Sequence, residues 1–230
     1  MASTTAMARL SRIAGDVPLA SGRAWLALLT GTAFTGVGVG AMLSAGLGVS
    51  PLDALFSGVS GLSGWTTGTV VLAAYGLLLL AAWLLGVKPA VGTFVSFLGV
   101  GLFIDFALMG SAAVGVADWQ VWARAVWWLS GLAVFAAGIV LMLASRLGAS
   151  PYDQFVVAVS QRLHRSLGVA RLLVDAVAIV GAFLLAGSWG VGTVVVLLVM
   201  PLVLNRLLAP VTAWVHPVVD DSVERVAART

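Results

Sequence analysis

Cysteine is absent from the chain, and histidine occurs only twice, as His164 and His216. The absence of cysteine excludes disulfide bonds, thiolate metal sites and a cysteine nucleophile. No group of histidine and acidic residues has the spacing that metal ligands require. The sequence therefore predicts a protein with no resident metal or cofactor.

Charged residues are also scarce, because only 9% of the 230 residues are charged whereas 61% are hydrophobic. A soluble domain carries about 25% charged residues, so this chain has too few to cover a surface that faces water. The sequence indicates an all-α integral membrane protein whose solvent is the lipid bilayer. The net charge of +3 does not indicate a nucleic-acid partner, since the basic residues lie in predicted loops, where membrane topology explains them.

The sequence has no polar stretch long enough for an ATPase or a soluble ligand-binding domain. Its first 24 residues contain Arg9, Arg12 and Arg23 but no long apolar run. We therefore expect no cleavable signal peptide, and we expect the first hydrophobic segment to remain in the mature protein.

What the chain does contain is an internal repeat with a spacing of 100 residues. LGVSPLD at 47–53 returns as LGASPYD at 147–153, and about 25 of the 82 pairs between 29–110 and 129–210 are identical. This spacing is too long for a solenoid unit. In a membrane protein it predicts a duplicated half-protein, an architecture that is common among secondary transporters.

Six segments are apolar and long enough to cross a bilayer, which takes about 20 helical residues. They lie at approximately 25–45, 67–85, 91–109, 122–144, 169–186 and 191–208. Two shorter segments, 50–64 and 150–164, follow the first and the fourth span. Because they are too short to cross, they are predicted to be half-helices that are either re-entrant or interfacial.

The positions of the basic residues test this count of spans. With the N-terminus in the cytoplasm, eleven of the twelve lysine and arginine residues fall on the cytoplasmic side, and only Arg124 falls outside. This distribution follows the positive-inside rule. Counting the short segments as full spans would place Arg146 opposite to Arg162 and Arg165. Six spans with both termini in the cytoplasm are therefore predicted.

Each repeat contains three spans, an odd number, so the second repeat is expected to enter the membrane upside down. The predicted fold has six transmembrane helices in two inverted-topology repeats of three, related by a pseudo-two-fold axis in the membrane plane. The predicted division is a cytoplasmic segment at 1–24, the first repeat at 25–110, an outer loop at 111–121, the second repeat at 122–210 and a cytoplasmic tail at 211–230.

The repeated Ser-Pro-x-Asp motif, SPxD below, is typical of a helix start. Ser50 and Ser150 are predicted N-cap residues, a proline follows each, and Asp53 and Asp153 fall at the third helical position. In one interpretation the carboxylates only complete the caps and oppose the helix dipole. In the other, two broken helices aim their positive N-termini at a solute or ion near the midplane, and the two aspartates bind a proton or cation.

Asp175 lies inside the fifth span, four residues after Arg171, at a spacing that lets the two side chains pair. An ionisable residue within a span is costly to bury and marks a functional site by default. The alternative is that Arg171 extends to the cytoplasmic interface and Asp175 neutralises it. Because Tyr75 is the repeat equivalent of Asp175, the two positions suggest one shared cavity. Asp105, near the outer end of the third span, is expected to be interfacial.

Enzyme functions find little support, and the chain is predicted not to be an enzyme. Gly-Leu-Ser-Gly at 61–64 is similar to an intramembrane serine protease motif, but both histidines fall in predicted cytoplasmic segments. Four tryptophans gather at the outer end of the fourth span: Trp119, Trp122, Trp127 and Trp128. We interpret them as an aromatic belt at the membrane surface.

The repeated Leu-Gly-x-Ser-Pro-x-Asp, together with Val-Gly-Thr at 91–93 and 191–193, resembles the YczE/YitT-like family of bacterial membrane proteins. The resemblance covers roughly residues 27–210 and implies a polytopic inner-membrane protein, without specifying a substrate. Three pairs depart from an even duplication: Tyr75/Asp175, Val71/Arg171 and Phe106/Arg206. An asymmetric site is expected there.

The leading hypothesis is a secondary transporter of the bacterial cytoplasmic membrane that moves a small solute or ion by alternating access of its two halves. The candidate binding residues are Ser50, Asp53, Tyr75, Ser150, Asp153, Arg171 and Asp175. One alternative is a non-transporting membrane partner, scaffold or regulator of another protein, and another is a channel. Small residues in the helices would permit a homodimer.

Overall fold

A computed structural model describes residues 22–148 and 150–217. Within these ranges the chain is helical and contains no β-strand. The elements are α2 (Gly22–Ala45), α3 (Pro51–Ser63), α4 (Thr67–Leu84), α5 (Val91–Ala113), the 3₁₀ turn η1 (Val116–Asp118), α6 (Val121–Ser145), α7 (Pro151–Leu163), α8 (Leu167–Leu184) and α9 (Val191–Val215). Most of the predicted terminal segments, with Arg9, Arg12, Arg225 and Arg229, lies outside the described residues.

Six of these helices are long and apolar enough to cross a membrane, namely α2, α4, α5, α6, α8 and α9. They confirm the six predicted spans, with boundaries that differ by a few residues. The largest difference is at α9, which continues to Val215 rather than ending near residue 208. The His216 amide still donates to the Thr212 carbonyl at 2.9 Å, so helical backbone bonding continues past the predicted end.

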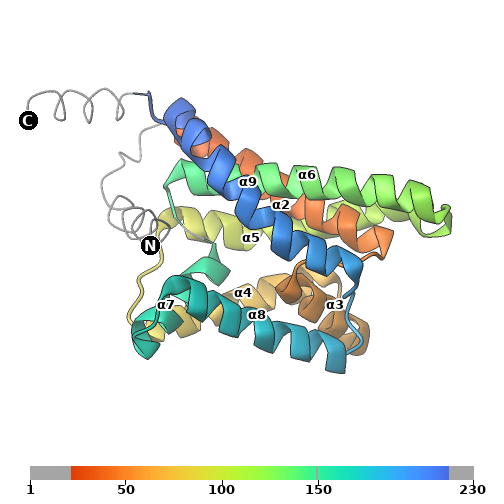
Figure 1. The fold of residues 1–230 in the computed structure, drawn as a ribbon, viewed down its shortest axis with the longest axis horizontal. Coiled ribbons are helices and arrows are strands. Elements are labelled where there is room, and N and C mark those ends of the chain that lie inside the picture. The colour runs from red at the N-terminus through yellow and green to blue at the C-terminus, as the bar shows by residue number, and fades with distance from the viewer. Residues whose placement is uncertain (1–21, 149, 218–230) are drawn as a thin grey trace, which may run out of the picture.

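The two SPxD segments form the short helices that the sequence predicts, each of 13 residues. Each begins at its proline and ends at a residue in the left-handed conformation, Gly64 for α3 and His164 for α7. A glycine adopts this conformation without cost, whereas histidine adopts it less readily. Figure 1 shows α3 at one end of the bundle and α7 at the other.

The helices form two layers, visible in Figure 1, with α2, α5, α6 and α9 in one and α3, α4, α7 and α8 in the other. Between the layers, α4 packs on α5. Within the second layer, α3 packs on α8 and α7 packs on α4, so each short helix contacts a long helix of the other repeat.

The start of α2 and the ends of α6 and α9 meet at one end of the bundle. Ala24 and Leu28 share an apolar cluster with Val215. His216, directly after α9, places its Nε2 atom 3.2 Å from the carbonyl oxygens of Ala144 and Ser145. The first and last spans therefore begin and end on the same side of the bundle, as an even number of spans requires.

Four glycines bring α2 and α6 into close backbone contact at the centre of the fold. A Cβ atom on Gly31 would lie 2.8 Å from the carbonyl oxygen of Gly138, and one on Gly38 would lie 2.7 Å from that of Gly131. Helices in lipid associate through such close packing of small residues, because burial of apolar surface provides no driving force there. These glycines occupy equivalent positions in the two repeats.

Candidate functional site

Both SPxD motifs form complete helix caps. The Ser50 hydroxyl oxygen accepts from the Asp53 amide at 3.4 Å and donates to the Asp53 carboxylate at 2.6 Å. The corresponding distances for Ser150 and Asp153 are 3.2 and 2.8 Å. The capping geometry predicted from the sequence is confirmed at both sites. Each carboxylate thus lies in the first turn of its helix, where the helix dipole favours negative charge.

The loop before each SPxD motif docks on the Val-Gly-Thr motif of the other repeat. The Gly192 amide donates to the Leu47 carbonyl at 2.8 Å, and the Gly92 amide donates to the Leu147 carbonyl at 3.1 Å. A Cβ atom on Gly48, which has a φ of +109°, would lie 2.9 Å from the Thr193 amide nitrogen. The SPxD loop of each repeat therefore forms a structural unit with the Val-Gly-Thr motif of the other repeat, and the fold contains two such units.

Two tryptophans that the sequence assigned to an aromatic belt instead face the protein. Trp128 is buried, and its indole Nε1 donates to the Gly48 carbonyl at 2.6 Å. Trp127 donates to the Ser44 hydroxyl at 3.1 Å. The belt interpretation is therefore wrong for Trp128, whose buried indole donates to a carbonyl of the loop between α2 and α3. Trp127 is half-buried. Trp122 is exposed, as the belt predicts.

Asp53 is the buried member of the two aspartates, with 6% of its surface exposed. Burial raises the pKa of its carboxyl to about 6, although the hydrogen bond from Ser50 acts in the opposite direction. Beside it, the ring of Phe56 packs edge-on against Tyr75 at a centroid distance of 6.0 Å. A carboxyl with such a pKa can take up and release a proton near neutral pH.

The second half of the site is more polar and more open. The Tyr152 hydroxyl donates to the Asp175 carboxylate at 2.6 Å, and burial raises the pKa of Tyr152. The Arg171 guanidinium lies 3.5 Å from the Asp153 carboxylate and 5.2 Å from the centre of the Tyr152 ring. The side chains of Arg171 and Asp153 are 46% and 26% exposed, so this pair is less enclosed by the protein than Asp53 is.

The predicted pairing of Arg171 with Asp175 is replaced by these two contacts. Both residues lie on α8, and the spacing of four residues would permit a bond. The start of α7 packs on α8, however, and brings Tyr152 and Asp153 within reach. The phenol then bonds Asp175 and the second aspartate bonds Arg171. The structure thus extends the site from one helix to two.

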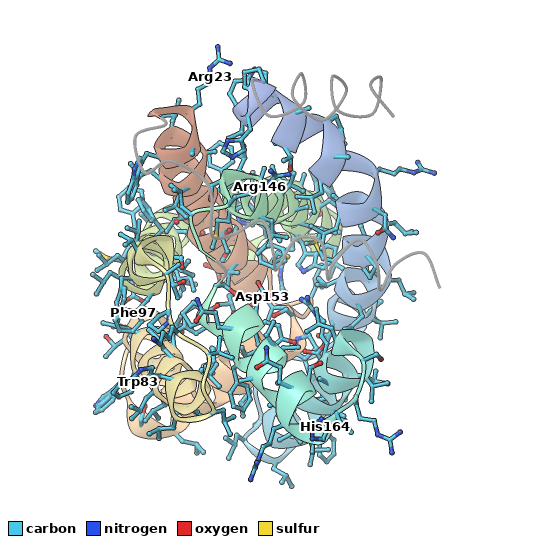
Figure 2. All side chains as sticks on the ribbon, turned by 90° about the vertical axis from the view of Figure 1, so that its left-hand side faces the viewer. Arg23, Trp83, Phe97, Arg146, Asp153 and His164 are labelled. Carbon is cyan, nitrogen blue, oxygen red and sulfur yellow. The ribbon has the colours of Figure 1, made fainter. Side chains whose placement is uncertain are left out.

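The two halves of the site meet at Tyr75. The carboxyls of Asp53 and Asp153 and the phenol of Tyr152 all lie within electrostatic range of its hydroxyl. In Figure 2, which looks along the bundle, Asp153 lies near the centre of the view. The structure therefore brings the seven predicted residues into one neighbourhood, reached by α3 from one end and by α7 from the other. Their role in binding stays a prediction.

The charges of this neighbourhood indicate which ligands it can hold. Three carboxyls, from Asp53, Asp153 and Asp175, are accompanied by one guanidinium, from Arg171, so negative charge is in excess when all are ionised. Such a site favours a proton or a cationic group over an anion. Among the described residues no group of three histidine, aspartate or glutamate side chains is arranged to hold a metal ion.

Sequence reasoning missed Tyr152 and Gln154, which lie on the first turn of α7. Gln154 is 6% exposed, and its Nε2 donates to the Thr93 hydroxyl at 2.6 Å, while its Oε1 has no hydrogen-bond partner among the residues that the structure describes. The signal was available in the repeat, because the equivalent positions in the first copy are the apolar residues Leu52 and Ala54. A polar residue where the other copy has an apolar one indicates a specific role.

Asp105 lies in the second half of α5, and its carboxylate links this helix to the start of α4. Its carboxylate accepts from the Thr66 hydroxyl at 2.6 Å and from the Gly68 amide at 2.7 Å, both at the start of α4. Of the three asymmetric pairs predicted to mark a site, Phe106 and Arg206 are both exposed and lie apart from it. The other two pairs contribute Tyr75, Asp175 and Arg171.

Six apolar spans around a buried polar neighbourhood define a multi-pass integral membrane protein. The chain belongs to a family of unknown function, DUF6198, whose model matches residues 22–207. It is 27% identical over 172 residues to an uncharacterized protein of Haemophilus influenzae, an alignment that covers 73% of this chain and 75% of that protein. It is 26% identical over 162 residues to the uncharacterized protein YyaS of Bacillus subtilis, covering 68% of this chain and 78% of YyaS. No solved structure matches the chain.

Proposed function

We propose that this protein is a secondary transporter of the bacterial cytoplasmic membrane, which moves a small solute by alternating access of two inverted halves. One observation carries the proposal: two short helices, α3 and α7, lie at opposite ends of the bundle, and their first turns lie within electrostatic range of the same residue, Tyr75. Discontinuous helices that point their N-termini at a central site are typical of transporters with internal repeats.

Reciprocal contacts support the inverted arrangement of the halves. Gly31 of the first repeat faces Gly138 of the second, and Gly38 faces Gly131, so the contact repeats with the roles exchanged. The same exchange relates the bonds from Gly192 to Leu47 and from Gly92 to Leu147. A two-fold axis that relates the repeats produces such pairs, whereas a simple translation of one repeat along the chain does not.

Asp53 supports a role for the proton in this transport. Its pKa of about 6 lies close to physiological pH, so modest changes in its surroundings change its protonation. We propose that Asp53 exchanges a proton as the halves rearrange, while the more open group formed by Tyr152, Asp153, Arg171 and Asp175 receives a small solute with a cationic group. The excess of carboxyls over guanidinium favours that charge.

The orientation and class of the protein complete the proposal. We place both termini in the cytoplasm because the basic residues favour that side, and both matched relatives are bacterial. We propose that the protein is not an enzyme, that it binds no nucleic acid, and that its partners are the bilayer and the transported solute. The likeness to the YczE/YitT-like family belongs to this proposal too.

Transport into proteoliposomes tests the proposal. The protein is reconstituted with a trapped pH-sensitive dye and exposed to a set of small cationic and zwitterionic solutes under an imposed pH gradient. We expect uptake of at least one solute to be accompanied by a proton flux, and we expect Asp53→Asn to abolish this coupling between solute and proton. Asp153→Asn should weaken solute uptake. Proton and solute fluxes unchanged by both substitutions would remove the two carboxylates from the mechanism.

A second function, a non-transporting partner or regulator of another membrane protein, is favoured by the packing around Asp53 and Tyr75. Both side chains are less than 10% exposed, and Phe56 closes against the phenol. A packed neighbourhood without space for a solute is compatible with a scaffold. The exposed apolar faces of the spans would then bind the partner or a second copy of this chain. Recovery of one stoichiometric membrane partner, with no solute flux in the liposome assay, would support this function over transport.

A further inference from the structure

We use the word seam for the interface between the last two spans of a repeat, which is α4 and α5 in the first repeat and α8 and α9 in the second. The two seams differ. The helices α4 and α5 pack against each other, whereas α8 and α9 make little direct contact. Both pairs consist of membrane-spanning helices and occupy equivalent places in the two repeats. The chain therefore closes one seam and leaves the other open.

Specific residues explain why the first seam closes. A Cβ atom on Gly68 would lie only 2.1 Å from the carbonyl oxygen of Gly101, so the backbones of α4 and α5 touch at these glycines. Asp105 ties α5 to the start of α4 just beyond this contact. In the second repeat Pro201 replaces Gly101, and a Cβ atom on Gly168 would meet none of the described residues within 4 Å. A proline ring cannot reproduce the close approach.

A cavity of about 530 Å³ lies in the open seam. Its wall is almost entirely apolar, and the lining residues include Ile179 of α8, Val194 and Leu197 of α9, and Trp189 of the loop between these helices. Its inner end reaches Pro51 and Ala54 in the first turn of α3. The volume lies within the range of ligand pockets, about 300–1,000 Å³.

In the first repeat the chain fills the equivalent space with its own side chains. Gln154 stands where the cavity has Ala54, and Phe97 stands where it has Leu197. Phe97 contacts Gly76 at 3.5 Å and lies between α5 and α4 in Figure 2. Leu79 is 8% exposed, whereas its equivalent Ile179 is 40% exposed. The cavity therefore lies where α8 and α9 stay apart and where Ala54, Val194 and Leu197 are smaller than their equivalents Gln154, Phe94 and Phe97.

We propose that the acyl chain of a bilayer phospholipid occupies this cavity. Two of its lining residues on α9, Val191 and Val194, are more than half exposed and belong to a span whose solvent is lipid. Water finds too few polar partners on an apolar wall to enter such a space. Hydrocarbon from the surrounding bilayer supplies the atoms that Phe97 and Gln154 supply in the first repeat, and it reaches the first turn of α3.

Photo-crosslinking in nanodiscs tests this proposal without reference to transport. The bilayer contains a phosphatidylcholine with a diazirine in the middle of one acyl chain, and mass spectrometry locates the adducts after irradiation. We expect adducts on Ile179 and Leu197 to exceed those on the outward-facing residues Leu198 and Leu202. The double substitution Ala54→Gln with Leu197→Phe copies the first repeat and should reduce adducts at Ile179 to the outward-facing level.

Leu198→Phe is the matched control, because it adds the same ring one residue away on the lipid-facing side and should leave the adducts at Ile179 unchanged. Adducts spread evenly over lining and outward-facing residues in the unsubstituted protein would overturn the proposal. Undiminished labelling of Ile179 in the filled variant would overturn it as well. If the double variant does not elute as a folded protein, Leu197→Phe alone provides the same comparison.

Discussion

At the scale of single residues, the two SPxD aspartates show how one motif acquires two environments. Asp53 is buried and bonds to Ser50, whereas Asp153 is partly exposed and also faces Arg171. The repeat position of Arg171 is Val71, an apolar residue. A single substitution on the neighbouring helix therefore decides which aspartate has a cationic partner.

The burial of Asp53 predicts a dependence of stability on pH. Its pKa rises from 3.8 to about 6 on folding, so the folded state binds the proton more tightly than the unfolded state. The resulting stabilisation is complete below pH 3.8 and is lost as the pH rises through 6. A shift of this size corresponds to about 3 kcal/mol as an upper bound. We expect the Tm in detergent to fall between pH 4.5 and pH 7.5.

Asp53→Asn should remove most of that fall, because the amide carries no titrating proton and its oxygen can still accept the hydrogen bond from the N-cap residue Ser50. Asp153→Asn, at the equivalent position, should leave the difference in Tm between pH 4.5 and pH 7.5 unchanged. A wild-type Tm that does not change over this range, or a change that persists in Asp53→Asn, would contradict the assignment to Asp53.

Residue-scale predictions from sequence succeeded where the chemistry is local. A serine, a proline and an aspartate at fixed spacing specify a cap, and both caps are present. The partner of Arg171 could not be predicted in the same way, because Asp153 is 18 residues away and reaches it only through the packing of α7 on α8. Helical spacing ranks partners within one helix and gives no information on partners in another.

At the scale of elements, the contact between α2 and α6 depends on glycines that leave no space for a side chain. A Cβ atom on Gly38 would lie 2.5 Å from the Phe135 amide nitrogen, an atom of the opposing backbone that cannot rotate away. The two helices would have to separate to admit a methyl group. Because this contact lies at the centre of the fold, its loss affects both repeats.

Gly38→Ala is therefore expected to destabilise the protein by about 1–3 kcal/mol, the usual cost of overpacking. Gly110→Ala is the matched control, since a Cβ atom at Gly110 on α5 would meet nothing within 4 Å. That change should leave stability equal or raise it by up to about 1 kcal/mol, because alanine favours helix more than glycine does. Thermal unfolding in detergent measures both, and equal Tm values for the two variants would contradict the close approach.

The elements themselves were largely predictable because length and polarity determine a membrane span. The six spans and the two short helices follow from runs of apolar residues and from proline. The docking of Leu47 on Gly192 did not follow, although both motifs were visible as copied segments. Pairing between distant segments depends on three-dimensional packing, and copying shows only that a segment is shared by the two repeats.

At the scale of the whole molecule, the direction of the spans predicts on which side each short helix ends. Because α3 and α7 lie at opposite ends of the bundle, Ser63 at the end of α3 and His164 at the end of α7 should face opposite sides of the membrane. The lack of cysteine in the chain makes a single introduced cysteine a specific label. Arg23, at the start of α2, should lie on the same side as His164.

We expect a membrane-impermeant maleimide to label Ser63→Cys in intact cells, and to label His164→Cys and Arg23→Cys only in inside-out vesicles. Arg23→Cys is the control for orientation, since it reports the side on which the first span begins. Labelling of Ser63→Cys and His164→Cys from one side would contradict the placement of the two short helices and, with it, the inverted arrangement proposed above.

The filled and the unfilled seam have a consequence for how such a protein can evolve. If two separate, identical half-length chains formed this bundle as a symmetric dimer, every substitution would occur in both seams at once, and neither could open without the other. Within one chain, Ala54 and Gln154 are encoded separately. Because both copies lie in one chain, each seam can change without the other, and the filling side chains can differ between them.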